Sequence, residues 1–224
     1  MKEYKRLWII LGLIMIGSFI ILGYFGKEIY NERPPIPAEF VDENGKTLYT
    51  EQDIMDGQSA WQSIGGMSVG TVWGHGAYQA PDWTADWIHR EVLGWLDQQA
   101  QREYGKPYAE LSERDQATLH YDAQQAFRKN TYDKTTGKVT LSADRVRSVE
   151  AVSAYYDKLF SDDPAFQKLR SAYAMKENTL PDPELRSKMA AFFFWSAWAA
   201  STNRPGLDVT YTNNWPHEPL IGNE

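Results

Sequence analysis

An uncharged, apolar run near the N-terminus constrains the fold of this chain more than any other feature. Residues 7–26 contain no charged side chain. At about 1.5 Å of rise per residue, a helix of this length can cross about 30 Å of hydrocarbon. The rival interpretation is a cleaved signal peptide, whose apolar region is usually about 7 to 15 residues long and ends at a small-x-small site. Because this run is longer and ends in Tyr24-Phe25-Gly26-Lys27, it predicts one uncleaved transmembrane helix.

The charges on either side of this helix predict its orientation. Three basic residues precede the run, whereas Lys27 and Arg33 follow it among two glutamates, a bias that favours a cytoplasmic N-terminus. We therefore expect a cytoplasmic segment at residues 1–6, a single-pass anchor at 7–26, a proline-rich linker at 27–39 and a domain at 40–224. That domain would lie on the periplasmic side of the inner membrane.

Charge and cysteine content exclude several kinds of site. The formal net charge is −7, and no basic cluster is present to follow a phosphate backbone, so no nucleic-acid partner is expected. The chain has no cysteine, which excludes disulfides, thiolate metal sites and a thioether-linked haem. The four histidines lack the paired spacing of a helical zinc motif, and no catalytic triad pattern stands out. Each is more simply explained as a structural residue: His75, His89, His120 and His217.

Patterns beyond the linker predict a mainly α-helical domain with a small β-hairpin. Asn44-Gly45 predicts a two-residue turn within a hairpin at residues 40–49. Helices are expected at 50–57, from a Thr84 cap to Gly105, at 118–129, from Ser142 through 159, in a short piece from 164 to 175, and at 184–201. Residues 130–138 read as an exposed, hairpin-like loop.

The last expected helix is apolar on all sides over residues 189–200. A second membrane span is one interpretation. About twelve residues fall short of the roughly twenty that a span requires, and Arg186 and Lys188 lie close before the run. We therefore expect a central helix of the domain core.

A stretch rich in tryptophan and glycine at residues 57–87 carries the first specific resemblance. Within it, Gly74-His75-Gly76-Ala77-Tyr78-Gln79-Ala80-Pro81 resembles the Gly-x-Gly-Ala-Tyr-x-Ala-Pro segment of bacterial nitric oxide reductases. Residues 199–206 (Ala-Ala-Ser-Thr-Asn-Arg-Pro-Gly) and 211–220 (Tyr-Thr-Asn-Asn-Trp-Pro-His-Glu-Pro-Leu) resemble the end of the N-terminal extension of the single-chain, quinol-dependent enzyme. The resemblance spans almost the whole chain.

The resemblance implies a cytochrome c-like fold that has lost its haem. In the cytochrome subunit of the two-subunit enzymes, Cys-x-x-Cys-His precedes the Gly-x-Gly-Ala-Tyr segment, whereas this chain has Gly66-Met67-Ser68-Val69-Gly70 there. Both thiols and the axial imidazole are absent. An empty cavity of that size would be destabilising, so we expect the surplus of aromatic side chains to fill it.

The implied function is that of a non-catalytic, membrane-anchored subunit or domain of a quinol-dependent nitric oxide reductase, which converts NO to N2O. The single-chain enzyme continues into a polytopic region that carries two b-type haems and a non-haem iron, whereas this sequence ends at Glu224. We expect either a split-gene subunit or a fragment, docked on a haem b-containing partner. The alternative is a stand-alone anchored module whose tryptophan- and glycine-rich stretch holds a small ligand.

Two candidate sites follow from this resemblance. The expected partner interface comprises Trp73, His75, Asn213, Asn214, Trp215, Pro216, His217 and Glu218, although the C-terminal run could instead cap its own domain. In the relatives a calcium ion lies at the subunit junction, and the matching positions here are Gly76 and Tyr78. The other interpretation is that Tyr78 packs beneath the indoles.

Overall fold

The computed structural model describes residues 2–224 as two compact units, divided between Pro35 and Ile36. The first unit is the helix α1 (Lys2–Glu32). Residues 4–32 within it are long and apolar enough to cross a membrane by length and composition. The predicted linker was wrong at its start, because residues 27–32 continue the helix. The helix ends where Pro34 and Pro35 follow, since proline has no N–H to donate and restricts the residue before it.

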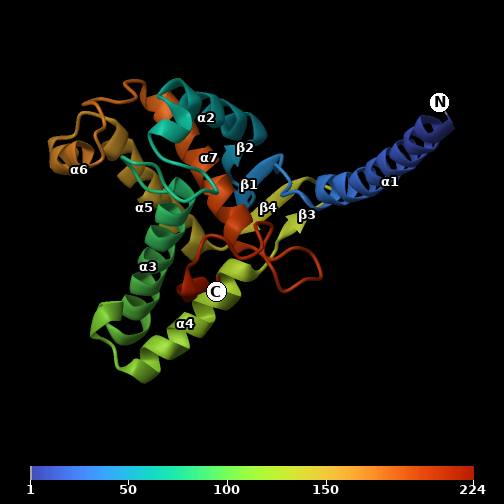
Figure 1. Ribbon diagram of the computed structural model, residues 1–224. Coiled ribbons are helices and arrows are strands. Elements are labelled where there is room, and N and C mark those ends of the chain that lie inside the picture. Colours follow the sequence, from blue (N-terminus) through green and yellow to red (C-terminus); the bar gives the residue numbers. More distant parts are fainter. Residues whose placement is uncertain (1) are drawn as a thin grey trace. The chain divides into compact units, whose positions relative to one another are not determined.

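The second unit is a helical domain with a small sheet, as predicted (Figure 1). Its helix α7 runs through the middle and is contacted by α2, α3 and α5. The domain's helices are α2 (Glu51–Ser63), α3 (Trp83–Tyr104), α4 (Glu113–Arg128), α5 (Ala143–Phe160), α6 (Gln167–Ala172) and α7 (Pro183–Ser201). Short 3-10 turns lie at η1 (Gly66–Ser68), η2 (Tyr108–Glu110), η3 (Pro164–Phe166) and η4 (Pro219–Ile221).

Helix α7 is the core of the domain, so the prediction of a central core helix is confirmed. Every residue from Met189 to Ser201 is buried. The helix begins at Asp182, whose side chain accepts a hydrogen bond from the Glu184 backbone N–H. Aromatic rings of α7 meet rings of α3 and α5: Phe193 stacks on Trp83 at 5.8 Å between centroids and lies edge-on to Tyr156 at 5.5 Å. Burial of each such ring stabilises the fold by about 1.5–3 kcal/mol.

Two hairpins join into one four-stranded sheet of order β2-β1-β4-β3. Strands β1 (Glu39–Asp42) and β2 (Thr47–Thr50) are antiparallel, as are β3 (Tyr132–Asp133) and β4 (Lys138–Leu141). The two hairpins were predicted, but their parallel junction between β1 and β4 was not. The predicted two-residue turn was also wrong. Four residues connect β1 to β2, only Gly45 has a positive φ, and the Asp42 carboxylate accepts from the backbone N–H groups of Asn44 and Lys46.

Several predicted helix boundaries were wrong, and for α3 and α4 the reason is that the capping residue lies earlier in the chain. Helix α2 does not end at 57; Thr50 and Asp53 form a capping box and the helix continues to Ser63. Helix α3 is capped by Asp82 rather than Thr84, although Gly105 ends it as expected. Helix α4 begins at Glu113, directly after its Ser112 cap, rather than at 118.

Close packing of α2 on α7 generates a stability prediction at Gly57. A Cβ atom at Gly57 would lie 1.9 Å from the carbonyl oxygen of Lys188, so Gly57→Ala must push the two helices apart. We expect a loss of about 1–3 kcal/mol in the free energy of unfolding. The matched control is Gly94→Ala in α3, where no atom lies within 4 Å and alanine should stabilise by about 0.5–1 kcal/mol. Denaturant unfolding followed by circular dichroism measures the unfolding free energy of both variants. Equal changes in the two would contradict close packing at Gly57.

Candidate functional site

The loop at residues 70–81 is organised by the buried carboxylate of Asp82. Its Oδ1 accepts from the Ala85 backbone N–H at 3.0 Å and so caps α3. Its Oδ2 accepts from the Thr71 hydroxyl at 2.7 Å and from the Gly74 backbone N–H at 2.6 Å. One side chain therefore ties the loop to the start of the helix. This role was not predicted from the sequence, although an aspartate between a proline and a helix is a recognisable cap.

Trp73 fastens the same loop to the core helix. Its indole Nε1 donates to the Ser196 carbonyl oxygen of α7 at 2.9 Å, and its ring lies 5.1 Å from that of Trp195. Its backbone N–H donates to the Thr84 hydroxyl at 3.3 Å. The φ of 54° at Trp73 is in the left-handed region, which a tryptophan adopts only where surrounding contacts hold it. Trp73 thus lies beneath the loop rather than on its outer face.

The C-terminal segment, residues 211–224, contacts this loop, although the two are far apart in the sequence. The Trp215 indole Nε1 donates to the Gly74 carbonyl oxygen at 3.1 Å, and the rings of His75 and Trp215 lie 4.6 Å apart. Together the segments line an open groove of about 530 Å³. Six predicted site residues line this groove: His75, Gly76, Tyr78, Trp215, Pro216 and His217.

Three other predicted interface residues hold the C-terminal segment in place. Asn213 Oδ1 accepts from Arg204 at 3.0 Å, and Asn214 Oδ1 accepts from Arg128 at 3.3 Å. Glu218 is buried and contacts His89 Nδ1 at 2.8 Å. None of the three lines the groove, so their part in an interface would be indirect.

The C-terminal segment also caps its own domain. Asn223 is buried and donates through Nδ2 to the carbonyl oxygens of Ala200 and Pro216 at 2.9 and 3.0 Å. The Arg128 Nε donates to the Ile221 carbonyl oxygen at 2.8 Å. The interpretation that this run caps its own domain is therefore confirmed for these residues. Trp215 and His217 are exposed on the cap, and their docking on a partner stays a prediction. Deleting the segment would remove part of the fold, so substitutions of exposed residues are the sharper test of docking.

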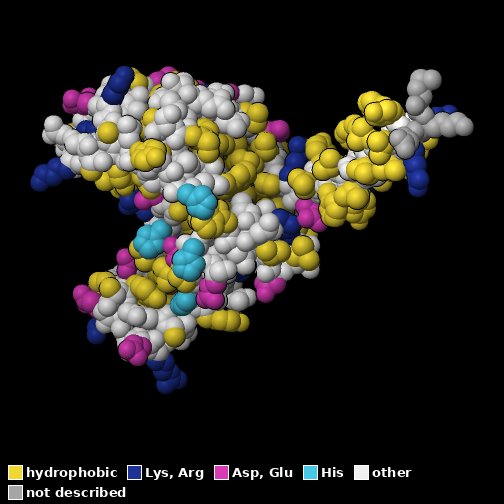
Figure 2. Space-filling view, in the orientation of Figure 1, with side chains coloured by type: hydrophobic (Ala, Val, Ile, Leu, Met, Phe, Trp, Pro, Cys, Tyr) yellow, Lys and Arg dark blue, Asp and Glu magenta, His cyan; other side chains and the backbone are white. Residues whose placement is uncertain are grey.

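All four histidines lie on or against this C-terminal segment. His75 packs on Trp215, His89 contacts Glu218, His120 Nε2 lies 2.8 Å from the Pro219 carbonyl oxygen, and His217 belongs to the segment itself. Figure 2 shows histidine side chains gathered on one face of the domain, close to hydrophobic ones. No local pattern predicts this gathering, because the four are spread over more than one hundred residues of chain.

Tyr78 projects from the groove and is fully exposed. The interpretation that it packs beneath the indoles was therefore wrong. The tight turn at Gly76, with φ of +84°, and the Ala77 N–H to Ala80 carbonyl bond at 2.9 Å leave the tyrosine at the outer edge of the loop. Behind it, the groove wall includes Tyr173, whose phenol pKa is raised by burial.

Among the described residues, no group of three or more His, Cys, Asp or Glu side chains could by itself hold a metal ion. Gly76 and Tyr78 line the groove, and the oxygens that they could offer are neutral, a backbone carbonyl and a phenol hydroxyl. The nearby Asp82 carboxylate already accepts three hydrogen bonds. Since calcium takes six to eight oxygens, these residues fit only a site that another polypeptide completes.

The family model for the cytochrome c-like domain of NorB, a nitric oxide reductase polypeptide, matches residues 37–217. The chain belongs to this family. The match begins next to the boundary of the second unit and ends at His217, so it includes the loop and the C-terminal segment as far as His217. No curated protein is similar enough to this chain to count as a match.

Because Asp82 both caps α3 and holds the loop, its replacement should lower the free energy of unfolding more than the loss of an ordinary helix cap does. Asp82→Ala removes the α3 cap and both loop hydrogen bonds, and we expect a loss of about 2–4 kcal/mol in the free energy of unfolding. The matched control is Asp182→Ala, which also follows a proline but accepts one bond, from Glu184 N–H, and should cost about 1 kcal/mol. Limited proteolysis should cut residues 70–81 in the first variant alone. Equal stability losses and an uncut loop would contradict the organising role.

Proposed function

We propose that this chain is a non-catalytic, membrane-anchored component of a quinol-dependent nitric oxide reductase. The observation that carries the proposal is the family match over residues 37–217 in a chain without cysteine. A nitric oxide reductase component without thioether haem cannot relay electrons as a cytochrome c does. Electrons from quinol would therefore reach the b-type haems of the reductase's catalytic part directly, and that part would reduce NO to N2O at its haem b and non-haem iron.

The groove between the loop and the C-terminal segment is the proposed docking surface. It presents aromatic and histidine side chains at its rim, and tyrosine and tryptophan are enriched at the centres of protein interfaces. The buried carboxylate of Asp82 and the Trp73 anchor keep this surface rigid before the partner arrives. A preorganised surface loses less conformational entropy on binding. Docking here would shield the partner's haems and fix the local water and proton paths.

The remaining parts of the proposal concern the membrane and calcium. Helix α1 would anchor the chain in the inner membrane with the domain on the periplasmic side, following the charge bias around it. Gly76 and Tyr78 would contribute two oxygens to a calcium site whose carboxylate ligands come from the partner. Calcium there would bridge the two polypeptides by binding oxygens from both.

Tyr78 gives a docking test that leaves the fold untouched. The Tyr78 side chain makes no buried contact, so Tyr78→Ala should preserve the thermal unfolding midpoint of the isolated chain. The same substitution should weaken co-purification with the haem b polypeptide at least about tenfold, as for an interface hot spot. The matched control is Tyr121→Ala, an exposed tyrosine on α4 away from the groove, which should co-purify like the parent.

Tyr78→Phe in the same preparation tests the calcium site, because it removes only the hydroxyl. Metal analysis of the purified complex should show less calcium in this variant than in the parent. Equal calcium in both, or none in either, removes Tyr78 as a ligand. Undiminished co-purification of Tyr78→Ala would contradict the docking surface itself.

A further inference from the structure

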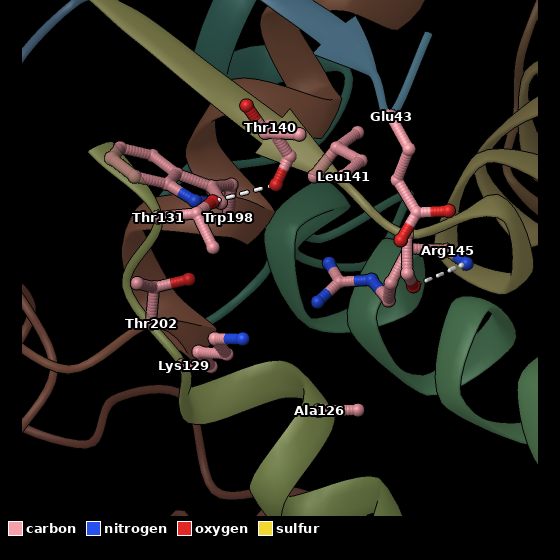
Figure 3. Close-up of a pocket in the computed structure, with 10 residues that line it drawn as sticks. Glu43, Ala126, Lys129, Thr131, Thr140, Leu141, Arg145, Trp198 and Thr202 are labelled. Atoms are coloured by element: carbon pink, nitrogen blue, oxygen red, sulfur yellow. Dashed lines mark hydrogen bonds between the residues drawn. The ribbon is translucent and has the colours of Figure 1, made fainter. Parts of the chain in front are cut away.

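A second cavity, away from the groove, lies at the start of α5. It has a volume of about 320 Å³ and is lined by residues of β4, the C-terminal ends of α4 and α7, and the first turn of α5 (Figure 3). No residue of the docking groove lines it. The proposed function therefore assigns it no role.

The buried side chain of Arg145 points its guanidinium into this cavity (Figure 3). Arg145 is 4% exposed, its Nε donates to Glu91 Oε1 at 2.7 Å, and its guanidinium carbon lies 3.8 Å from the centre of the Phe127 ring. Its Nη2 is buried and has no hydrogen-bond partner among the described residues. A buried, unpaired donor on a cation is costly, and a guanidinium has a planar edge suited to a carboxylate. A guanidinium that lines the cavity thus has an unmet hydrogen-bonding requirement.

The charges around the cavity leave this edge available to an anion. The Glu91 carboxylate lies on the Nε side of Arg145, and its second oxygen accepts a hydrogen bond from the Trp87 indole at 3.0 Å. Burial raises the pKa of Glu91. Lys129 is exposed, lines the cavity and has no ion-pair partner among the described residues. Glu43 lines the cavity as well and is the one lining carboxylate that would oppose an anion.

The start of α5 favours a negative group at one end of the cavity, whereas two hydroxyl groups in the wall contribute no donor. Ser142, the N-cap of the 18-residue helix α5, lines the cavity, and helix N-termini attract anions. The hydroxyls of Thr131 and Thr202 donate to the carbonyl oxygens of Thr140 and Phe127 at 2.7 and 3.3 Å, so they offer no further proton to a ligand. The donors for an anion are therefore Arg145, Lys129 and the helix start.

The rest of the wall is apolar. Trp198 and Leu141 are buried core residues that also line the cavity, and Ala126 adds a methyl group. We propose that this cavity binds a small organic carboxylate, with its carboxylate on the Nη edge of Arg145 and beside Lys129, and its apolar body against Trp198 and Leu141. Inorganic phosphate has no apolar body and should bind less well.

Isothermal titration calorimetry on the full chain in detergent tests this site with three probes: benzoate, its uncharged isostere benzamide, and inorganic phosphate. Benzoate should bind, and the other two should bind at least about tenfold more weakly. Lys129→Ala should weaken benzoate binding severalfold, because the ammonium is a partner rather than the main anchor. The matched control is Lys134→Ala in the loop between β3 and β4, which should bind benzoate like the parent.

Arg145→Lys keeps the charge beside Glu91 but removes the planar edge, and should weaken benzoate binding by about tenfold or more. If this variant does not fold, as judged by circular dichroism, Lys129→Ala decides alone, because Lys129 is exposed and has no ion-pair partner to lose among the described residues. Three results would overturn the proposal. These are no binding of benzoate, equal binding of benzamide or phosphate, and parent-like benzoate binding by the Lys129 variant.

Discussion

The domain depends on burying one helix on all sides. Every side chain from Met189 to Ser201 must be covered, so α2, α3 and α5 are arranged around α7 and supply rings and small residues that match its surface. Trp87 and Tyr156 show how dense this packing is. Their rings lie parallel at 5.2 Å, and each donates its polar hydrogen to a carboxylate, Trp87 to Glu91 and Tyr156 to Asp86. The polar hydrogens of these two rings are thus satisfied within the core, whereas the buried indole N–H groups of Trp61, Trp83 and Trp95 have no partner among the described residues.

The same helix positions the groove. Trp73 reaches the Ser196 carbonyl oxygen on α7, and Asn223 reaches the Ala200 carbonyl oxygen on the same helix. The loop and the C-terminal segment are thus fixed to one element, and the bond from Trp215 to Gly74 joins them to each other. A surface made from two distant segments is rigid here because both are tied to the core.

Local signals in the sequence predicted much of this fold. The helix start at Ser142, the stop at Gly105 and the apolar run of α7 each depend on residues close together in the chain, so they could be predicted from local sequence. Contacts between distant segments could not be read in this way: the parallel pairing of β1 with β4, the gathering of the histidines and the Arg145 cavity all depend on tertiary packing. Six of the residues predicted for a partner interface or a calcium site lie together in the groove, and those two roles stay predictions. Asp82, which orders their loop, was missed because the cap was assigned two residues too late.

We propose that aromatic packing around α7 occupies the space that a haem fills in a cytochrome c, so that this domain folds unaided. The most direct test is to produce the full chain in a host that cannot make haem and in the same host supplied with haem. Thermal unfolding and the visible absorption spectrum are then compared. The account predicts the same unfolding midpoint in both preparations and no Soret band in either. A Soret band that persists through purification, or a lower midpoint without haem, would contradict it.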